Sequence, residues 1–267
     1  HIYNEVFKLW SFLRLYKNKS KVFSIQHGGH HQLIYTSYDY EFKNFNKHIS
    51  WIKKYNKYSK SLPIIKYFFK QDINYLSNEK ILFVGNDKHD FFSRITPGPV
   101  SNNSYFAIKD LIQIHNKLKK NIASKIFYIG KDKNIIIKNI NFLKNESLRQ
   151  NLKKARLVIC TYPMTTFIDS LLSCPTILVC RPDQWQEISM LSNSYKSLKK
   201  NKIIFSNPEE AADHINNFWD RIDDWWNSKN VNKAKNDFLN NFDYSFNNKK
   251  NLVRWSKFIQ KQYKGID

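Results

Sequence analysis

The sequence predicts an α/β protein built around a mostly parallel, doubly wound sheet. From residue 81 onward, short apolar runs of strand length alternate with segments of helical periodicity, the element order of βαβ units. The runs are continuously apolar, which is typical of strands covered on both faces. Small or polar residues follow most of them. Because ligands of such sheets bind beyond the carboxyl ends of the strands, those residues are the first candidates for a site.

The N-terminal part of the chain holds fewer clear elements. Residues 2–17 carry apolar and aromatic side chains at helical spacing and predict an amphipathic helix. Residues 21–26 predict a short strand that leads directly into the sequence HGGHH. Residues 49–52 fit a further short strand inside an aromatic and polar stretch without clear periodicity.

Strands and helices then alternate regularly. Strands are predicted at residues 81–84, 125–129, 157–160, 176–179 and 203–205. Helices are predicted at residues 105–119, 146–154 and 165–172. Asn207 and Pro208 suit the N-cap and first position of another helix, which Glu210 favours from its third position. The chain from Trp219 onward is predicted to be helical. A change in composition near residues 60–80 marks a domain boundary, and we place the domains at residues 1–70, 71–230 and 231–267.

Composition and charge exclude several classes of protein. Apolar residues make up 42% of 267 residues, enough for a sizeable core. Three cysteines without a CxxC pair predict neither a disulfide scaffold nor a zinc site, and favour a reducing, cytoplasmic compartment. No apolar run reaches the roughly 20 residues of a membrane span, and no signal peptide is visible. The chain begins at His1, which is compatible with a fragment of a longer protein.

The net charge of +22 comes almost entirely from lysine. Asparagine and isoleucine are abundant as well, a pattern that A/T-rich codons produce without any selection for binding. Arginine, which recognises bases and phosphates best, is sparse. The charge therefore favours phosphorylated substrates or an anionic membrane over nucleic acid.

The segment 161–169 is the sharpest candidate site. A strand ends before Thr161, Pro163 turns the chain, and a helix is predicted to begin near Thr165. The amino end of a helix attracts phosphate, and the hydroxyls of Thr165 and Thr166 add hydrogen-bond donors. Asp169, one turn later, is placed to accept from a ribose hydroxyl. The alternative is a helix capped by threonine with a surface aspartate.

A second candidate follows the strand at residues 21–26. Gly28 and Gly29 let the backbone approach a ligand closely, and His27 has the pKa range of a general base, with His30 as second choice. The alternative is a tight turn with exposed histidines. A metal site is not predicted, because these histidines lack a nearby acidic partner and the chain has no Asp-x-Asp motif.

Further candidates lie in the remaining loops that follow strands. Arg94 and Lys131 suit a phosphate or carboxylate, although solvated side chains fit as well. Trp185 suits stacking on a base or sugar, or plain packing, and Glu187 lies beside it. The tryptophans of the helical tail are predicted to pack in the core, and the cysteines to be inert.

Four stretches together resemble a transferase family encoded in bacterial O-antigen and surface-polysaccharide loci. They are QHGG at residues 26–29, the stretch from Glu41 to Trp51, the segment 155–169, and residues 208–226 with PEEAA, WD and WW. The segment 155–169 is also similar to CDP-glycerol glycerophosphotransferases and capsule sugar transferases, in which a Ser/Thr pair opens a helix after a buried strand.

The resemblance implies a GT-B-type architecture of two Rossmann-like domains with a donor cleft between them. Residues 1–70 would then be the C-terminal part of an acceptor-side domain, 71–230 the domain that binds the nucleotide donor, and 231–267 helices that pack back. Too little chain precedes Gln26 for a whole N-terminal domain, so we expect that domain to be incomplete. His30-His31-Gln32 and Asp169 depart from the family, which has Tyr-Gly and Glu there.

The resemblance also implies a function. It predicts a glycosyltransferase-like enzyme of surface polysaccharide or O-antigen synthesis that takes a nucleotide-activated sugar or polyol phosphate as substrate and needs no cofactor. The acceptor would be a glycan or a lipid-linked glycan, and the location cytoplasmic, with peripheral contact to an anionic membrane as a further option. The alternatives are a basic module that binds nucleic acid or anionic surfaces, and a truncated homologue without catalysis. The residues implied for the donor and catalysis are His27, Gly28, Gly29, His30, Arg94, Lys131, Thr161, Thr165, Thr166, Asp169, Trp185 and Glu187.

Overall fold

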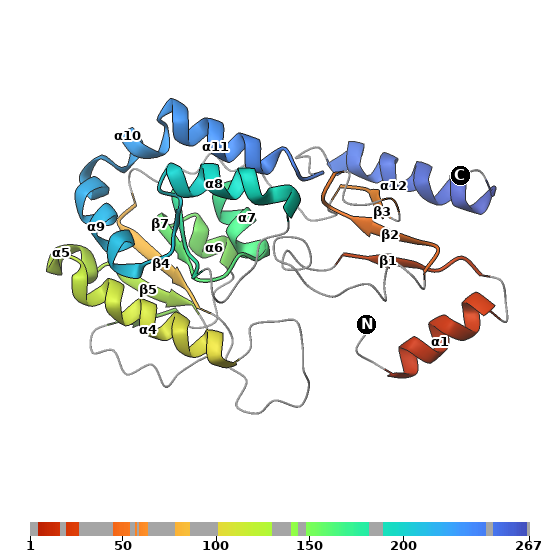
Figure 1. The fold of residues 1–267 in the computed structure, drawn as a ribbon, viewed down its shortest axis with the longest axis horizontal. Helices are drawn as coiled ribbons and strands as arrows, with labels where there is room; N and C mark the ends of the chain where they lie inside the picture. The colour runs from red at the N-terminus through yellow and green to blue at the C-terminus, as the bar shows by residue number, and fades with distance from the viewer. Residues whose placement is uncertain are drawn as a thin grey trace. The chain divides into compact units, whose positions relative to one another are not determined.

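A computed structural model of the chain describes residues 5–16, 20–26, 45–53, 57, 59–63, 78–85, 101–129, 140–143, 148–181, 189–243 and 248–265. These residues fall into two compact units, shown in Figure 1. The first unit holds one helix and three strands from the N-terminal part of the chain, together with the last helix. The second unit holds a six-stranded sheet with its helices.

The first unit is built on a small parallel sheet. Its strands are β1 (Phe23–Ile25), β2 (Lys47–Ser50) and β3 (Ser59–Ser61), in the order β1-β2-β3. The predicted strand at 21–26 is confirmed, and the strand placed at 49–52 begins two residues earlier. β3 was not predicted, because the sequence Ser-Lys-Ser carries no apolar pattern. Two helices complete the unit, α1 (Glu5–Tyr16), which confirms the predicted N-terminal helix, and α12 (Asn248–Tyr263).

The core of the first unit joins its sheet to α12. Ile49 and Phe258 are buried there, and the rings of Phe258 and Phe23 lie 5.4 Å apart. Asp243 accepts two hydrogen bonds of 2.6 Å from the guanidinium of Arg254 on α12, and one of 2.7 Å from Ser61 on β3. Burial alone would raise the pKa of Asp243, but the hydrogen bonds and positive charge of Arg254 outweigh it and lower that pKa.

The second unit confirms the predicted parallel α/β sheet. Its strands are β4 (Lys80–Val84), β5 (Ile126–Ile129), β6 (Asn141–Phe142), β7 (Ala155–Cys160), β8 (Thr176–Val179) and β9 (Ile204–Phe205). All neighbours pair in parallel, in the order β6-β5-β4-β7-β8-β9. The chain runs outward from β4 to β6, returns to place β7 beside β4, and then runs outward in the other direction. This reversal, the topological switch point, therefore lies between β4 and β7.

Helices cover both faces of this sheet. They are α4 (Ser101–Lys117), α5 (Lys120–Ala123), α6 (Leu148–Leu152), α7 (Thr165–Leu171), α8 (Ser192–Lys200), α9 (Pro208–Phe218), α10 (Ile222–Trp226) and α11 (Lys229–Leu239), with 3₁₀ turns η2 (Ser189–Leu191) and η3 (Trp219–Arg221). In Figure 1, α4 lies beside α9, and α8 lies along α11. The sequence did not predict α5, α8 or β6. None of the helices in the described ranges is long and apolar enough to cross a membrane.

The predicted start of the helix at residue 208 is confirmed. Pro208 is its first residue, and the side chain of Asn207 accepts a hydrogen bond of 2.8 Å from the backbone N–H of Glu209. The tryptophans of the helical tail are buried, as predicted. Their exposed fractions are 5% for Trp219, 7% for Trp225 and 4% for Trp226.

His214 of α9 lies within an aromatic cluster. Its ring centroid is 5.4 Å from that of Phe205 and 4.8 Å from those of Phe218 and Trp225. Burial, assisted by the positive charge of Lys202, lowers the pKa of His214 from 6.5 to about 4. The folded protein therefore keeps this imidazole neutral at pH values where the unfolded chain protonates it.

We expect the stability of the protein to fall between pH 6.5 and pH 4 because of His214. Above pH 6.5 the imidazole is neutral in both states and contributes no pH dependence, whereas below it only the unfolded chain binds the proton. The loss reaches up to about 3 kcal/mol near pH 4 and levels off below. Urea unfolding of wild type and His214→Phe across this range measures it, and the variant should show a flatter profile. Equal slopes in the two proteins would contradict the assignment.

Candidate functional site

The switch point of the second unit brings two strand ends together. Val84 of β4 pairs with Cys160 of β7, and Gly85 and Thr161 follow them. The Thr161 hydroxyl, which is buried, donates a hydrogen bond of 3.4 Å to the carbonyl oxygen of Val84. This contact joins the carboxyl ends of the two central strands. A doubly wound sheet binds its ligand at such a position.

Gly85 serves packing at this edge. A Cβ atom at residue 85 would lie 2.0 Å from the phenol oxygen of Tyr128 and 2.4 Å from the ring carbon that bears it. Tyr128 belongs to β5, is 2% exposed, and stacks on Phe83 with the ring centroids 6.2 Å apart. The small residue that the sequence places after β4 therefore makes room for a core side chain.

The turn between β7 and α7 is tightly packed. Tyr162 is 4% exposed, and Met164 and Cys180 pack against it. Burial is the main cause that raises the pKa of the Tyr162 phenol, and the neighbouring Cys180 adds to the shift. The phenol therefore stays protonated. Met164 is the N-cap residue of α7, with an extended backbone and no side-chain capping bond. The alternative interpretation of this segment, a helix capped by threonine, is therefore wrong. The capping residue is Met164, and Thr165 is already the first residue of the helix.

Thr165 and Thr166 are the first two residues of α7, and both are half-buried. Asp169, one turn later, is half-buried too. Burial raises the pKa of the Cys160 thiol to about 12, and the negative charge of Asp169 adds to the shift. The Asp169 carboxylate therefore lies near the end of β7. Three of the predicted donor-binding residues thus gather on one short helix beside the switch point.

The two buried cysteines are inert, as the sequence predicts. Cys160, Cys174 and Cys180 are all free thiols, and the first two are buried. Burial is the main cause of the raised pKa of both buried thiols. Neither thiol forms the reactive thiolate at neutral pH.

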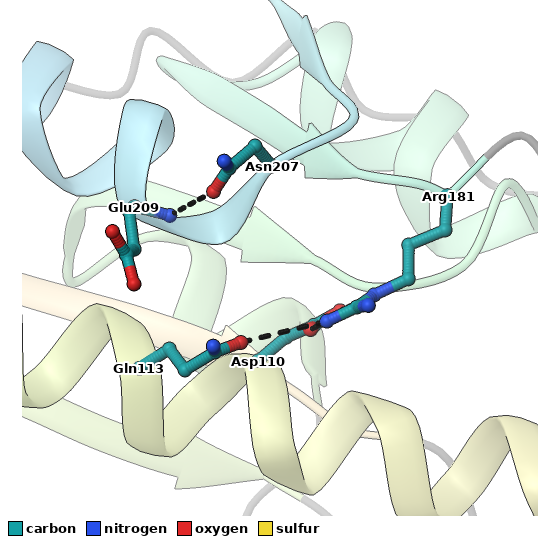
Figure 2. A network of polar contacts seen from close by, with 5 residues as sticks. All are labelled: Asp110, Gln113, Arg181, Asn207 and Glu209. Atoms are coloured by element: carbon teal, nitrogen blue, oxygen red, sulfur yellow. Dashed lines mark hydrogen bonds and ion pairs between the residues drawn. The ribbon is translucent and has the colours of Figure 1, made fainter.

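A buried ion pair lies after the next strand, and sequence reasoning missed it. Figure 2 shows Arg181, which follows β8, extending to Asp110 and Gln113 on α4. The guanidinium forms an ion pair with the Asp110 carboxylate, with Nε 3.2 Å from Oδ1. Its Nη2 lies 3.4 Å from the Gln113 side-chain oxygen. The Asp110 side chain is 4% exposed and that of Arg181 is 24% exposed, so little water reaches the ion pair. The pair links α4 to the end of β8.

Gln26 fixes the strand end that leads to the predicted catalytic histidine. It is 2% exposed, and its side-chain oxygen accepts a hydrogen bond of 2.7 Å from the backbone N–H of Trp51. Its own N–H donates to the carbonyl of Ile49 at 2.9 Å. The first residue of the QHGG motif is therefore a buried structural link between β1 and the end of β2.

The other predicted site residues lie outside the described residues. They are His27, Gly28, Gly29, His30, Arg94, Lys131, Trp185 and Glu187. Within the described ranges, no three His, Cys, Asp or Glu side chains are grouped to hold a metal ion. The absence of a metal from the mechanism stays a prediction, because three histidines of the HGGHH loop lie outside those ranges.

Comparisons with known proteins decide the family. Residues 1–259 match the family described as LIC12162 family transferase. The chain belongs to this family. A solved structure of the wall teichoic acid polymerase TagF is 12% identical, with a TM-score of 0.52, over 92% of this chain and 69% of that one. That likeness confirms the GT-B-type, Rossmann-like architecture. No curated protein sequence matches the chain significantly.

Proposed function

We propose that this LIC12162 family member transfers a sugar or polyol phosphate from a nucleotide-activated donor during bacterial surface-polysaccharide or O-antigen synthesis. The transferase family and the TagF-like fold support a glycosyltransferase-type enzyme. The observation that carries the donor site is the topological switch point between β4 and β7. A cytoplasmic location is part of the proposal, and the free thiols of all three cysteines support it.

The site residues take separate roles in this proposal. The hydroxyls of Thr165 and Thr166 bind the donor phosphates, and Asp169 accepts from the ribose. For a sugar donor, the bond from the anomeric carbon to the phosphate oxygen breaks while the acceptor hydroxyl oxygen bonds to that carbon. His27, or His30 as second choice, takes the acceptor proton, and the nucleoside diphosphate leaves. Hydrogen-bond donors that stabilise the negative charge of the departing phosphate make the largest contribution to the rate in such reactions.

We expect Thr165→Val with Thr166→Val to weaken nucleotide binding strongly and leave the fold intact. Valine has nearly the shape of threonine and replaces the hydroxyl with a methyl group. Both side chains are half-buried, so solvent already reaches them. Removing two hydrogen bonds to a charged phosphate should weaken binding by roughly 100-fold. A thermal-shift screen with CMP, CDP, UDP, GDP and ADP measures it, because a ligand that binds only the folded state raises the melting temperature.

The matched control removes two hydroxyls elsewhere in the second unit. Ser192→Ala with Ser197→Ala changes half-buried residues of α8 and should keep the wild-type nucleotide response. Unchanged affinity in the double valine variant would contradict the phosphate assignment. If no nucleotide raises the melting temperature of the wild-type protein, and the protein binds oligonucleotides with a steep salt dependence, the result would favour the basic binding module instead.

A further inference from the structure

The last helix, α12, has two apolar faces. One face packs into the first unit, where Phe258 is 8% exposed and the indole N–H of Trp255 donates to the carbonyl of Pro63 at 2.9 Å. Arg254 on the same side is held by Asp243. These contacts anchor the helix without using its other apolar residues.

The second apolar face is exposed. Leu252 is 56% exposed, Ile259 59% and Tyr263 93%. Their spacings of seven and four residues place them along one side of the helix. Val253, 51% exposed, points about 100° away from Leu252, toward the lysines of the helix. A helix anchored by one face ordinarily carries polar residues on the others. We call Leu252, Val253, Ile259 and Tyr263 the apolar stripe.

Positive charge lies along one edge of the apolar stripe, on the side away from the face that packs into the first unit. Residues 248–264 contain neither aspartate nor glutamate. All the lysines of this range are exposed, namely Lys249, Lys250, Lys257, Lys261 and Lys264. An apolar row with lysines along one edge fits a helix that lies in the headgroup region of a membrane, where long lysine side chains reach the phosphates.

The first helix of the same unit repeats this combination. In α1, Ser11 is buried, while Leu9, Phe12 and Leu13 are 59%, 53% and 46% exposed. The guanidinium of Arg14 lies 5.5 Å from the ring centroid of Trp10, which is 48% exposed. Tryptophan and arginine together suit a membrane interface, where one end of the pair is apolar and the other wet.

We propose that the first unit binds the surface of an anionic lipid bilayer, with the apolar stripe of α12 buried among the headgroups and its lysines on anionic lipid. Negative lipid headgroups complement a lysine-rich helix and a chain of net charge +22. A second copy of the chain complements it poorly, since a two-fold contact would bring two identical rows of lysine together. This inference does not depend on the proposed donor chemistry.

The full chain is tested by cosedimentation with vesicles of phosphatidylcholine alone and of phosphatidylcholine mixed with phosphatidylglycerol. We expect binding to the mixed vesicles and at least roughly tenfold weaker binding to the neutral ones. The triple variant Leu252→Ser, Ile259→Ser, Tyr263→Ser should lose at least roughly tenfold in partitioning. Lys249→Gln, Lys257→Gln and Lys261→Gln together should lose roughly 100-fold.

Two control variants separate this site from the overall charge and apolar surface of the protein. Lys196→Gln, Lys229→Gln and Lys233→Gln remove the same charge from exposed positions of the second unit. Ile112→Ser with Met190→Ser removes exposed apolar side chains there. Both controls should bind like wild type. Equal losses in the two lysine variants, equal binding to both vesicle types, or a dimer in light scattering that the α12 serine variant dissolves would each overturn the proposal.

Discussion

Gly85→Ala is expected to destabilise the second unit by about 3 kcal/mol, at the upper end of overpacking costs. The added methyl group would lie 2.0 Å from the phenol oxygen of Tyr128 and within 2.6 Å of two ring carbons. Those atoms have no room to retreat, because Tyr128 is 2% exposed and stacks on Phe83. Chemical denaturation followed by circular dichroism measures the loss.

A double-mutant cycle with Tyr128→Leu identifies the cause. Leucine removes the ring atoms that the new methyl group meets, so the double variant should lose about 2 kcal/mol less than the sum of the single variants. Gly265→Ala is the matched control. Gly265 has a φ of 70° but no heavy atom within 4 Å of its Cβ position, so only backbone strain of about 1 kcal/mol is expected. Additive losses in the cycle would mean that a different contact limits residue 85.

The strands of the second unit were predictable because burial on both faces leaves continuous apolar runs. Residues 157–160 and 176–179 have that character, and β7 and β8 cover them. The strand β3 and the two-residue strand β6 have no such signal, because edge strands this short are formed by backbone pairing with a neighbour. The helix α8 was missed because its many serines and lysines leave only Tyr195 and Leu198 as buried anchors.

The candidate site was predictable only in its position along the chain. A polar turn after an apolar run identifies residues 161–169, but the packing of Tyr162 against Cys180 depends on a strand neighbour that the sequence does not name. Asp110 had one usable signal. It lies among Ala107, Leu111 and Ile114 on the buried face of α4, where an acidic residue demands a partner. The partner, Arg181, follows β8, and the sequence does not show that this strand end lies beside α4.

We expect Asp110→Leu to lower the free energy of unfolding by about 3 kcal/mol, because it leaves the Arg181 guanidinium without its carboxylate in a largely buried position. That guanidinium lies 5.4 Å from the ring centroid of Phe106 and is 24% exposed, so little water can replace the carboxylate. The loss should appear as a lower denaturation midpoint in urea with an unchanged slope.

Asp110→Leu combined with Arg181→Met should restore most of that stability, to within about 1 kcal/mol of wild type. A buried ion pair recovers little more than the cost of removing its charges from water, so apolar residues of similar volume replace both partners at small cost. Asp213→Asn supplies the exposed control. Its partner Lys117 lies 3.7 Å away with both side chains about half exposed, and the change should stay below about 0.5 kcal/mol. A double variant as unstable as Asp110→Leu alone would contradict this assignment. It would show that Arg181 or Asp110 makes a further contact that the apolar pair does not replace, and that the ion pair is not what links α4 to β8.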